Sequence, residues 1–133
     1  MFADGGARGN PGPAAIGVVI DINKEIKEYF EAIGNTTNNV AEYKSAIFAL
    51  KKAKHLIGGE KSKKAEIEIN SDSELLVSQI NGEYKIKNED LGYLFIEIWN
   101  LKQDFKNVVF KHILREKNKK ADLLVNRALD TLF

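Results

Sequence analysis

The sequence contains no cysteine, and none of its apolar runs is long enough to cross a membrane. Without cysteine the chain can form neither disulfides nor thiolate metal centres, so any bound metal must be a hard ion on oxygen ligands. A membrane-spanning helix needs about 18 or more consecutive apolar residues, and no signal peptide is apparent either. We therefore expect a cytoplasmic protein with no membrane partner.

A large net charge is also missing. The formal charge is +1 at pH 7, which by itself does not indicate a nucleic-acid-binding protein. The charge is unevenly distributed, because residues 101–127 hold eight lysines or arginines against three acids. A second basic group lies within residues 51–64. Such clusters are either solvated helix faces, which is the more common case, or phosphate-binding surfaces.

What the sequence does contain is typical of one globular domain, residues 1–133. The chain is 44% hydrophobic and 29% charged, enough for a sizeable core, and no linker or repeat divides it. Apolar alternation predicts strands ending at Ala3 and over 14–22, 26–33, 65–71 and 108–114. Helical spacing predicts helices over 39–57, 74–80, 89–105 and 119–132. Asn38 or Asn39 is the expected N-cap of the first helix, and Gly58-Gly59 its end.

This order of elements predicts an α/β fold with a five-stranded mixed sheet. Hairpins come first, so strands one to three are antiparallel. Right-handed crossovers then place strands four and five parallel to strand one, with helices on both faces. Ligands of such sheets gather outside the carboxyl ends of the parallel strands. Asp4 and Asp72 follow the predicted strands one and four, where two acids from distant parts of the chain can meet.

Two further acids, Glu42 and Asp122, stand near the starts of predicted helices. Converging carboxylates repel one another unless a cation lies between them, so the four acids predict a divalent-metal site. Two ions roughly 3.5–4 Å apart need three or four carboxylates to hold them around one phosphate oxygen. Each acid also has an ordinary explanation. Asp4 and Asp72 suit turns or caps, and Glu42 and Asp122 suit the first turn of a helix.

The residues around the acids form four motifs, and these carry more information than the acids alone. They are DGGARGNPGP at 4–13, TNNVAE at 37–42, SDS at 71–73 and HILREKNKKAD at 112–122. In this order, and over nearly the whole chain, they resemble the successive motifs of type 1 ribonuclease H. The resemblance implies the ribonuclease H-like fold. It also implies cleavage of the RNA strand of RNA–DNA hybrids with two Mg²⁺ or Mn²⁺ ions, leaving 5′-phosphate and 3′-hydroxyl ends.

The resemblance also implies roles for single residues. Asp4, Glu42, Asp72 and Asp122 resemble the four catalytic, metal-binding acids of the family. A second set resembles the residues that touch the hybrid, and it consists of Gly5, Asn10, Thr37, Asn38 and Asn39. Short polar side chains and glycine-exposed N–H groups can approach 2′-hydroxyls and phosphates closely, so we expect recognition by shape and largely sequence-independent cleavage.

His112 and Arg115 are both candidates for a further catalytic role. His112 lies ten residues before Asp122, where some family members carry a histidine that helps proton transfer or product release. It falls inside a predicted strand, where a histidine is more often structural. Arg115 is placed to face the scissile phosphate, because a guanidinium can clamp phosphate oxygens, and its alternative is an ordinary surface arginine. We favour Arg115.

The sequence departs from the family pattern in three places. Only three residues precede Asp4, which predicts a short first strand and a weakly held acid, unless the true start lies upstream. The segment 81–88 is too short for the basic protrusion of some bacterial members, and a patch from Lys102 to Lys120 is expected to substitute in part. No hybrid-binding domain precedes the motifs, so affinity for the hybrid should be modest and salt-sensitive. No obligate protein partner is implied.

Other functions remain open at this point. The enzyme could have relaxed specificity and also cut double-stranded RNA, which shares 2′-hydroxyls and A-like shape with the hybrid. A non-catalytic nucleic-acid-binding module is the alternative of a different class, although carboxylates that repel phosphate would not help it bind. A transposase- or integrase-like nuclease fits less well, because the NPGP loop and the Asn38-Asn39 pair are not expected there.

Overall fold

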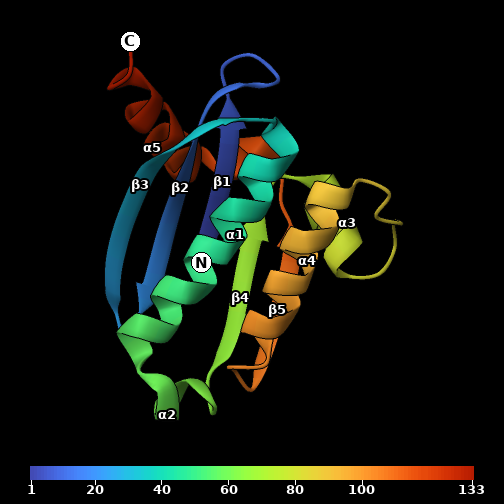
Figure 1. Ribbon diagram of the computed structural model, residues 1–133. Helices are drawn as coiled ribbons and strands as arrows, with labels where there is room; N and C mark the ends of the chain where they lie inside the picture. Colours follow the sequence, from blue (N-terminus) through green and yellow to red (C-terminus); the bar gives the residue numbers. More distant parts are fainter.

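A five-stranded sheet runs through the middle of the molecule, with its strands in the order β3-β2-β1-β4-β5 (Figure 1). The computed structural model describes all residues, 1–133. The strands are β1 (Phe2–Ala7), β2 (Gly12–Ile22), β3 (Glu25–Thr36), β4 (Glu66–Ser71) and β5 (Asn107–His112). β2 pairs antiparallel with β1 and β3, whereas β4 pairs parallel with β1 and β5. The predicted mixed sheet is therefore confirmed.

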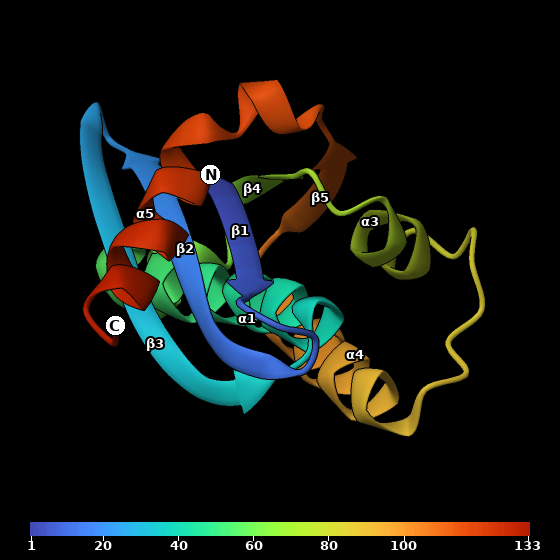
Figure 2. The same ribbon diagram turned by 90° about the horizontal axis from the view of Figure 1, so that it is seen from above.

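Helices cover both faces of the sheet, as predicted. They are α1 (Asn38–Ile57), α2 (Gly59–Ser62), α3 (Glu74–Ile80), α4 (Glu89–Lys102) and α5 (Lys119–Asp130). Seen from above, α1 and α4 lie on one face, and α5 lies on the other face against β2 and β3 (Figure 2). None of the helices combines the length and the apolar character needed to cross a membrane.

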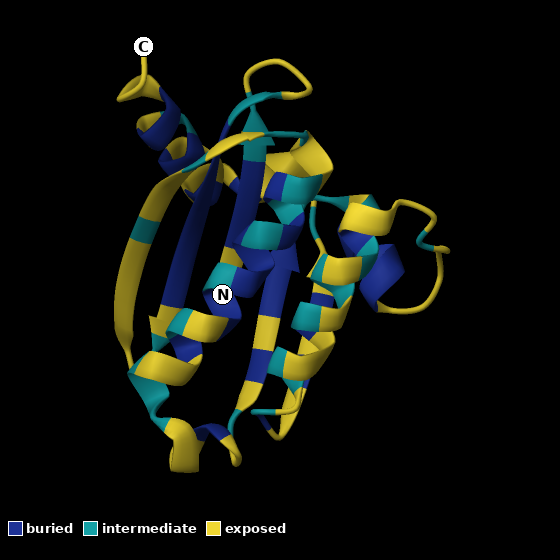
Figure 3. Ribbon diagram, viewed as in Figure 1, coloured by how far each residue is buried: buried dark blue, intermediate teal, exposed yellow.

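The core lies mainly between the sheet and α1. The residues of α1 that face the sheet are buried, whereas the opposite face of the helix is exposed (Figure 3). Alanines let the helix approach the strands closely, since Ala41, Ala46, Ala49 and Ala53 are all completely buried. A smaller cluster on the other face joins β2 to α5 and consists of Ala15, Val125, Ala128 and Leu129. The two clusters thus pack α1 and α5 against opposite faces of the sheet.

Two glycines allow the helices to touch the sheet beside the predicted site. A Cβ on Gly5 of β1 would lie 2.2 Å from the carbonyl oxygen of Ala41 in α1. A Cβ on Gly17 of β2 would lie 2.3 Å from the carbonyl oxygen of Ala121 in α5. Ala41 and Ala121 directly precede two of the acids, Glu42 and Asp122. The missing side chains therefore bring those acids close to β1.

We expect Gly17→Ala to destabilise the protein by roughly 1–3 kcal/mol, because the new methyl group must displace backbone atoms of α5. Urea unfolding followed by circular dichroism measures the loss. Gly92→Ala is the matched control, since Gly92 lies within α4 and a Cβ there would meet no atom within 4 Å. That variant should gain up to about 1 kcal/mol from helix propensity. Equal effects in the two variants would contradict the close contact at Gly17.

Three local predictions are wrong. β1 does not stop at Ala3, because Gly5 and Gly6 continue the ladder with β2, opposite Ile16 and Ala15. The first strand therefore has six residues, and Asp4 lies within it, only 6% exposed, and is not weakly held. The N-cap of α1 is Thr37, whose hydroxyl accepts the N–H of Val40 at 3.2 Å, rather than Asn38 or Asn39.

Other boundaries differ from the predictions by a few residues. α4 ends at Lys102 rather than at 105, β5 ends at His112 rather than at 114, and α5 ends at Asp130 rather than at 132. The short helix α2 and a 3₁₀ turn at Arg115–Lys117 were not predicted. The predicted end of α1 is confirmed, since Gly58 adopts a φ of 93° there, which favours glycine. Helix ends lack a sharp sequence signal when no glycine or proline marks them.

Candidate active site

Carboxylates from three elements converge at one end of the parallel strands. The parallel pairing of β1 with β4 ends at Ala3 and Ser71, so the next residue on each strand, Asp4 and Asp72, lies where the two strands part. Glu42 reaches the same point from the first turns of α1. One carboxylate oxygen from each of the three acids lies within 4.8 Å of those of the other two. The predicted meeting of distant acids is therefore present.

Glu42 is held in place by the sheet. The backbone N–H of Gly5 donates a hydrogen bond of 2.7 Å to its Oε1. A hydrogen bond from an N–H to a carboxylate is charge-assisted and stronger than one between neutral groups. The glycine that lets α1 approach β1 thus also fixes the orientation of the acid on α1.

Asp122 is the outermost of the four acids. It is exposed at the start of α5 and is not within reach of all three others, but its charge helps to raise the pKa of Asp4. All four acids line one cleft of about 400 Å³. The structure thus places the predicted metal-binding acids together, three close and one at the edge.

The acids strongly affect one another's protonation. Burial, followed by the charges of Asp72 and Asp122, raises the pKa of Asp4 from 3.8 to about 8. Burial and the charges of Asp4 and Asp72 also raise the pKa of Glu42 well above its usual value, although the N–H of Gly5 opposes this shift. Without a cation the cluster therefore holds protons at neutral pH. Closely spaced hard oxygen donors of this kind fit a divalent ion such as Mg²⁺ or Mn²⁺.

Asn10 and Asn38 join the loop after β1 to the start of α1 through two hydrogen bonds. Asn38 Oδ1 accepts the N–H of Ala7 at 2.8 Å, and Asn10 Oδ1 accepts the N–H of Asn38 at 3.0 Å. Asn38 and Asn39 line the cleft beside Gly5, whereas Asn10 and Thr37 do not line it. Asn10 instead holds the start of α1 against the loop that follows β1, and Thr37 caps α1 itself.

The structure separates the two further candidates. Arg115 belongs to the 3₁₀ turn before α5 and lines the cleft. His112 is the last residue of β5, is exposed, and does not line the cleft. Its place in a strand is as predicted. The position of Arg115 in the cleft supports the preference for this residue.

Sequence reasoning did not single out Arg8 and Asn126, which also line the cleft. Asn126 Nδ2 donates to the backbone oxygen of Asp122 at 3.1 Å and lies 3.5 Å from its carboxylate Oδ2. Arg8 Nη2 contacts Asn126 Oδ1 at 3.4 Å and the carboxylate of Asp130 at 2.5 Å. The i,i+4 spacing of Asp122 and Asn126 was a signal that could have identified Asn126. Arg8 had no comparable signal, because it lies in a glycine-rich segment that predicted a turn.

The basic residues from Lys102 to Lys120 do not form one continuous surface. β5 lies between its two halves and spans about 20 Å at the usual rise per residue. Lys102 and Lys106 lie before the strand, at the end away from the cleft, and Arg115 follows it. Within the patch, Lys111 pairs with Glu68 at 2.7 Å and Lys120 pairs with Glu28 at 2.9 Å.

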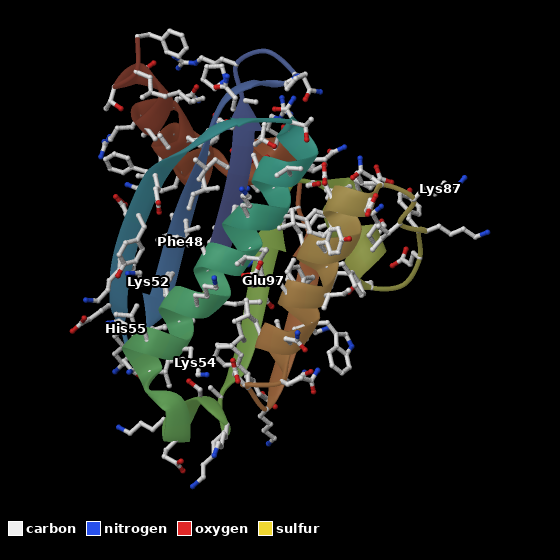
Figure 4. The ribbon with its side chains drawn as sticks, viewed as in Figure 1. Phe48, Lys52, Lys54, His55, Lys87 and Glu97 are labelled. Carbon is white, nitrogen blue, oxygen red and sulfur yellow. The ribbon has the colours of Figure 1, made fainter.

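The second basic group is divided between the last turns of α1 and the segment of α2 and its following turn. Lys52 and Lys54 lie on the half of α1 that is remote from its first turn (Figure 4). Lys54 pairs with Asp104 at 3.2 Å, and Lys52 lies 5.6 Å from the ring centroid of Phe48. Lys87 projects outward from the loop between α3 and α4 (Figure 4). None of these lysines lines the cleft that holds the four acids.

Comparison with known proteins identifies the family. A family model described as reverse transcriptase-like matches residues 2–128. LC11-RNase H1, isolated from compost by a metagenomic approach, is 48% identical to this chain. Its structure in complex with an RNA/DNA hybrid matches 98% of this chain and 96% of that chain, with a TM-score of 0.91. The chain belongs to the ribonuclease H family.

Other members of the ribonuclease H family show the same likeness. The RNase H1 of the halophilic archaeon Halobacterium salinarum is 36% identical, covers 98% of this chain and 96% of its own, and has a TM-score of 0.87. A bifunctional protein of Mycobacterium tuberculosis is 39% identical over 131 residues, which are 96% of this chain and 34% of that protein. The chain therefore spans about a third of the length of this mycobacterial relative. The family resemblance seen in the four motifs is confirmed.

Proposed function

We propose that this chain is an endonuclease that hydrolyses the RNA strand of RNA–DNA hybrids with two Mg²⁺ or Mn²⁺ ions, leaving 5′-phosphate and 3′-hydroxyl ends. The observation that carries the proposal is the convergence of the Asp4, Glu42 and Asp72 carboxylates within 4.8 Å. Burial makes this cluster costly unless a cation neutralises it. The complex of LC11-RNase H1 with an RNA/DNA hybrid supports the choice of substrate.

In this proposal Asp4, Glu42, Asp72 and Asp122 hold the metal ions. Bound ions of this type activate a water for attack on phosphorus and stabilise the leaving oxygen. The sheet supplies rigidity, because Asp4 lies inside a paired strand and the Gly5 N–H fixes Glu42. Asp122, which is more exposed, completes the set at the edge of the cleft.

The rim of the cleft is proposed to recognise the substrate. Asn38 and Asn39 expose short amide side chains beside Gly5, so a sugar-phosphate backbone can approach closely. Asn10 and Thr37 contribute by fixing the start of α1 through their hydrogen bonds to Asn38 and Val40. Contacts of this kind depend on 2′-hydroxyls and duplex shape, so cleavage should be largely independent of base sequence.

A cleavage assay tests the function directly. The protein is incubated with labelled RNA–DNA hybrid, double-stranded RNA and DNA duplex, each with Mg²⁺, Mn²⁺ or EDTA, and the ends of the products are mapped. We expect metal-dependent cutting of the hybrid's RNA strand only. Cutting of double-stranded RNA would indicate relaxed specificity. Binding of the hybrid without cutting in either metal would indicate a non-catalytic module.

We expect Arg115→Ala to lower the single-turnover cleavage rate by roughly 10²-fold, because its guanidinium is proposed to stabilise charge on the scissile phosphate. His112→Ala is the matched comparison, since His112 lies only three positions away but outside the cleft. It should change the rate by less than about 3-fold, since it contributes no proton transfer, which is typically worth at least about 10². A large loss confined to His112→Ala would reverse these two assignments.

A further inference from the structure

One buried amide connects the parts of the cleft that carry the acids. Asn118 is only 1% exposed and immediately precedes α5. An asparagine at this position usually accepts an N–H of the first helical turn with its side chain, but Asn118 makes no such capping bond. Its Nδ2 instead donates across the interface to the carbonyl oxygen of Ala3 in β1, at 2.9 Å. The side chain therefore joins α5 to the sheet rather than capping its own helix.

The bonds of Asn118 lead directly to residues of the cleft. Ala3 is the residue before Asp4, so the side-chain bond holds the peptide group that precedes this acid. The main-chain oxygen of Asn118 accepts the N–H of Asp122 at 3.1 Å, and its main-chain N–H donates to the oxygen of Arg115 at 2.9 Å. A single residue thus connects the backbone at Asp4, Asp122 and Arg115.

Stability alone does not account for this amide. Its Oδ1 is buried and has no hydrogen-bond partner. A buried acceptor without a donor costs about as much as, or more than, one ordinary hydrogen bond contributes. The single bond to Ala3 therefore brings little net stability, and its main consequence is geometric.

We propose that Asn118 is a positioning residue that fixes the separation of Asp4 and Asp122 and thereby sets the affinity of the carboxylate cluster for divalent metal ions. The inference rests on the metal site of the proposed function. Asp122 is the exposed member of the cluster and lies on α5, outside the sheet, so a fixed link to the strand of Asp4 bears directly on its position. Residues that orient metal ligands typically change metal affinity by roughly 10–100-fold when they are replaced.

Asn70 of β4 provides a matched control, because its side chain also bonds to the backbone next to β1. It is 7% exposed, and its Nδ2 donates to the carbonyl oxygen of Met1 at 3.0 Å. Met1 lies on the side of Ala3 away from Asp4, so this bond does not bear on the acids. Asn70→Ala therefore removes a similar side-chain to backbone bond without touching the link between Asp4 and Asp122.

The test measures Mn²⁺ binding to the substrate-free protein by isothermal titration calorimetry, using Asn118→Ala, Asn118→Leu and Asn70→Ala. Leucine fills the volume of the amide and removes the unpaired Oδ1, so this variant should keep the fold even where alanine does not. We expect Mn²⁺ to bind about 10-fold more weakly to both Asn118 variants, and within about 2-fold of wild type to Asn70→Ala. In cleavage assays the half-saturating Mg²⁺ concentration should rise by a similar factor while the KM for the hybrid stays unchanged.

Unchanged Mn²⁺ affinity in a folded Asn118 variant would overturn the inference, as would equal weakening in Asn70→Ala. Unfolding of both Asn118 variants in metal-free buffer would also overturn it, because the role would then be structural only. Wild-type protein that binds Mn²⁺ but does not cut the hybrid would contradict the proposed function and leave this inference to be judged by the affinities. Absence of metal binding by the wild type would contradict both.

Discussion

Asp4→Asn is expected to lower the cleavage rate by at least about 10³-fold, or ~4 kcal/mol in the transition state, while the protein remains folded. Asp4 is the only one of the four acids that is a buried residue, and the charges of both Asp72 and Asp122 act on its carboxylate, so it is the central oxygen donor of the cluster. Asparagine has nearly the same shape but carries no charge to hold a divalent ion. Single-turnover cleavage of a labelled hybrid at saturating enzyme measures the loss.

The same substitution should leave hybrid binding within about 3-fold of wild type, because the proposed substrate contacts lie on the rim at Asn38 and Asn39. Gel shift in EDTA and far-UV circular dichroism check binding and fold. Asp104→Asn is the matched control, since it removes one acid that pairs with Lys54 far from the cleft. If Asp4→Asn keeps more than about a tenth of the wild-type rate, the metal site is assigned to the wrong residues.

The arrangement of the sheet could be predicted from the sequence because the pattern of connections is local. A hairpin through 21–25 makes β2 and β3 antiparallel, and each later crossover is long enough for a helix. Gly58 ends α1 where the sequence indicated, since a positive φ favours glycine. The convergence of Asp4 and Asp72 followed from these features, because parallel strands end at the same edge.

Features that depend on contacts between distant residues could not be predicted. Gly5 and Gly6 favoured a loop in the sequence, but pairing with β2 keeps them in the strand and places Asp4 inside it. The close contacts of Gly5 and Gly17 with the helices have no local signal, because they become visible only when the layers are packed. The bond from Asn118 to Ala3 has no local signal either, because it joins residues 115 positions apart.

The preference for Arg115 over His112 shows the limit of motif spacing. Both residues stand at fixed distances before Asp122, and the sequence indicates only that His112 lies in a strand. The structure adds that β5 ends at His112 and that a 3₁₀ turn brings Arg115 to the cleft. Arg115 therefore lies in the cleft, whereas His112, three residues earlier, lies outside it.

The second large effect is expected in the pH dependence of stability. Asp4 has a pKa of about 8 in the folded protein and an ordinary value of 3.8, so between these limits the folded state keeps a proton that the unfolded state has lost. The free energy of unfolding of the metal-free protein should therefore fall as pH rises through this window, by up to about 1.4 kcal/mol per pH unit for one proton. Glu42, whose pKa is also raised, contributes with the same sign.

Asp4→Asn isolates the contribution of this acid because it cannot ionise. In EDTA the variant should be more stable than wild type at pH 8, and the difference should become small near pH 4, where Asp4 is protonated in the folded state and about half protonated in the unfolded state. Thermal unfolding of both proteins from pH 4 to pH 8 measures the difference in stability. Subtracting the pH dependence of the variant from that of the wild type removes the contributions of the groups that titrate in both proteins. A difference independent of pH would show that Asp4 ionises normally in the folded protein.

Divalent metal should reverse this dependence for the wild type. A metal ion binds the deprotonated carboxylates and competes with their protons, so Mg²⁺ should raise the wild-type melting temperature more at pH 8 than at pH 6. Asp4→Asn should show little metal-induced stabilisation at either pH, because its cluster lacks the central donor. The substitution that abolishes cleavage thus stabilises the metal-free protein, which is the expected behaviour of an acid whose buried charge serves to bind a cation. Equal stabilisation of both proteins by Mg²⁺ at pH 8 would mean that the ion binds elsewhere.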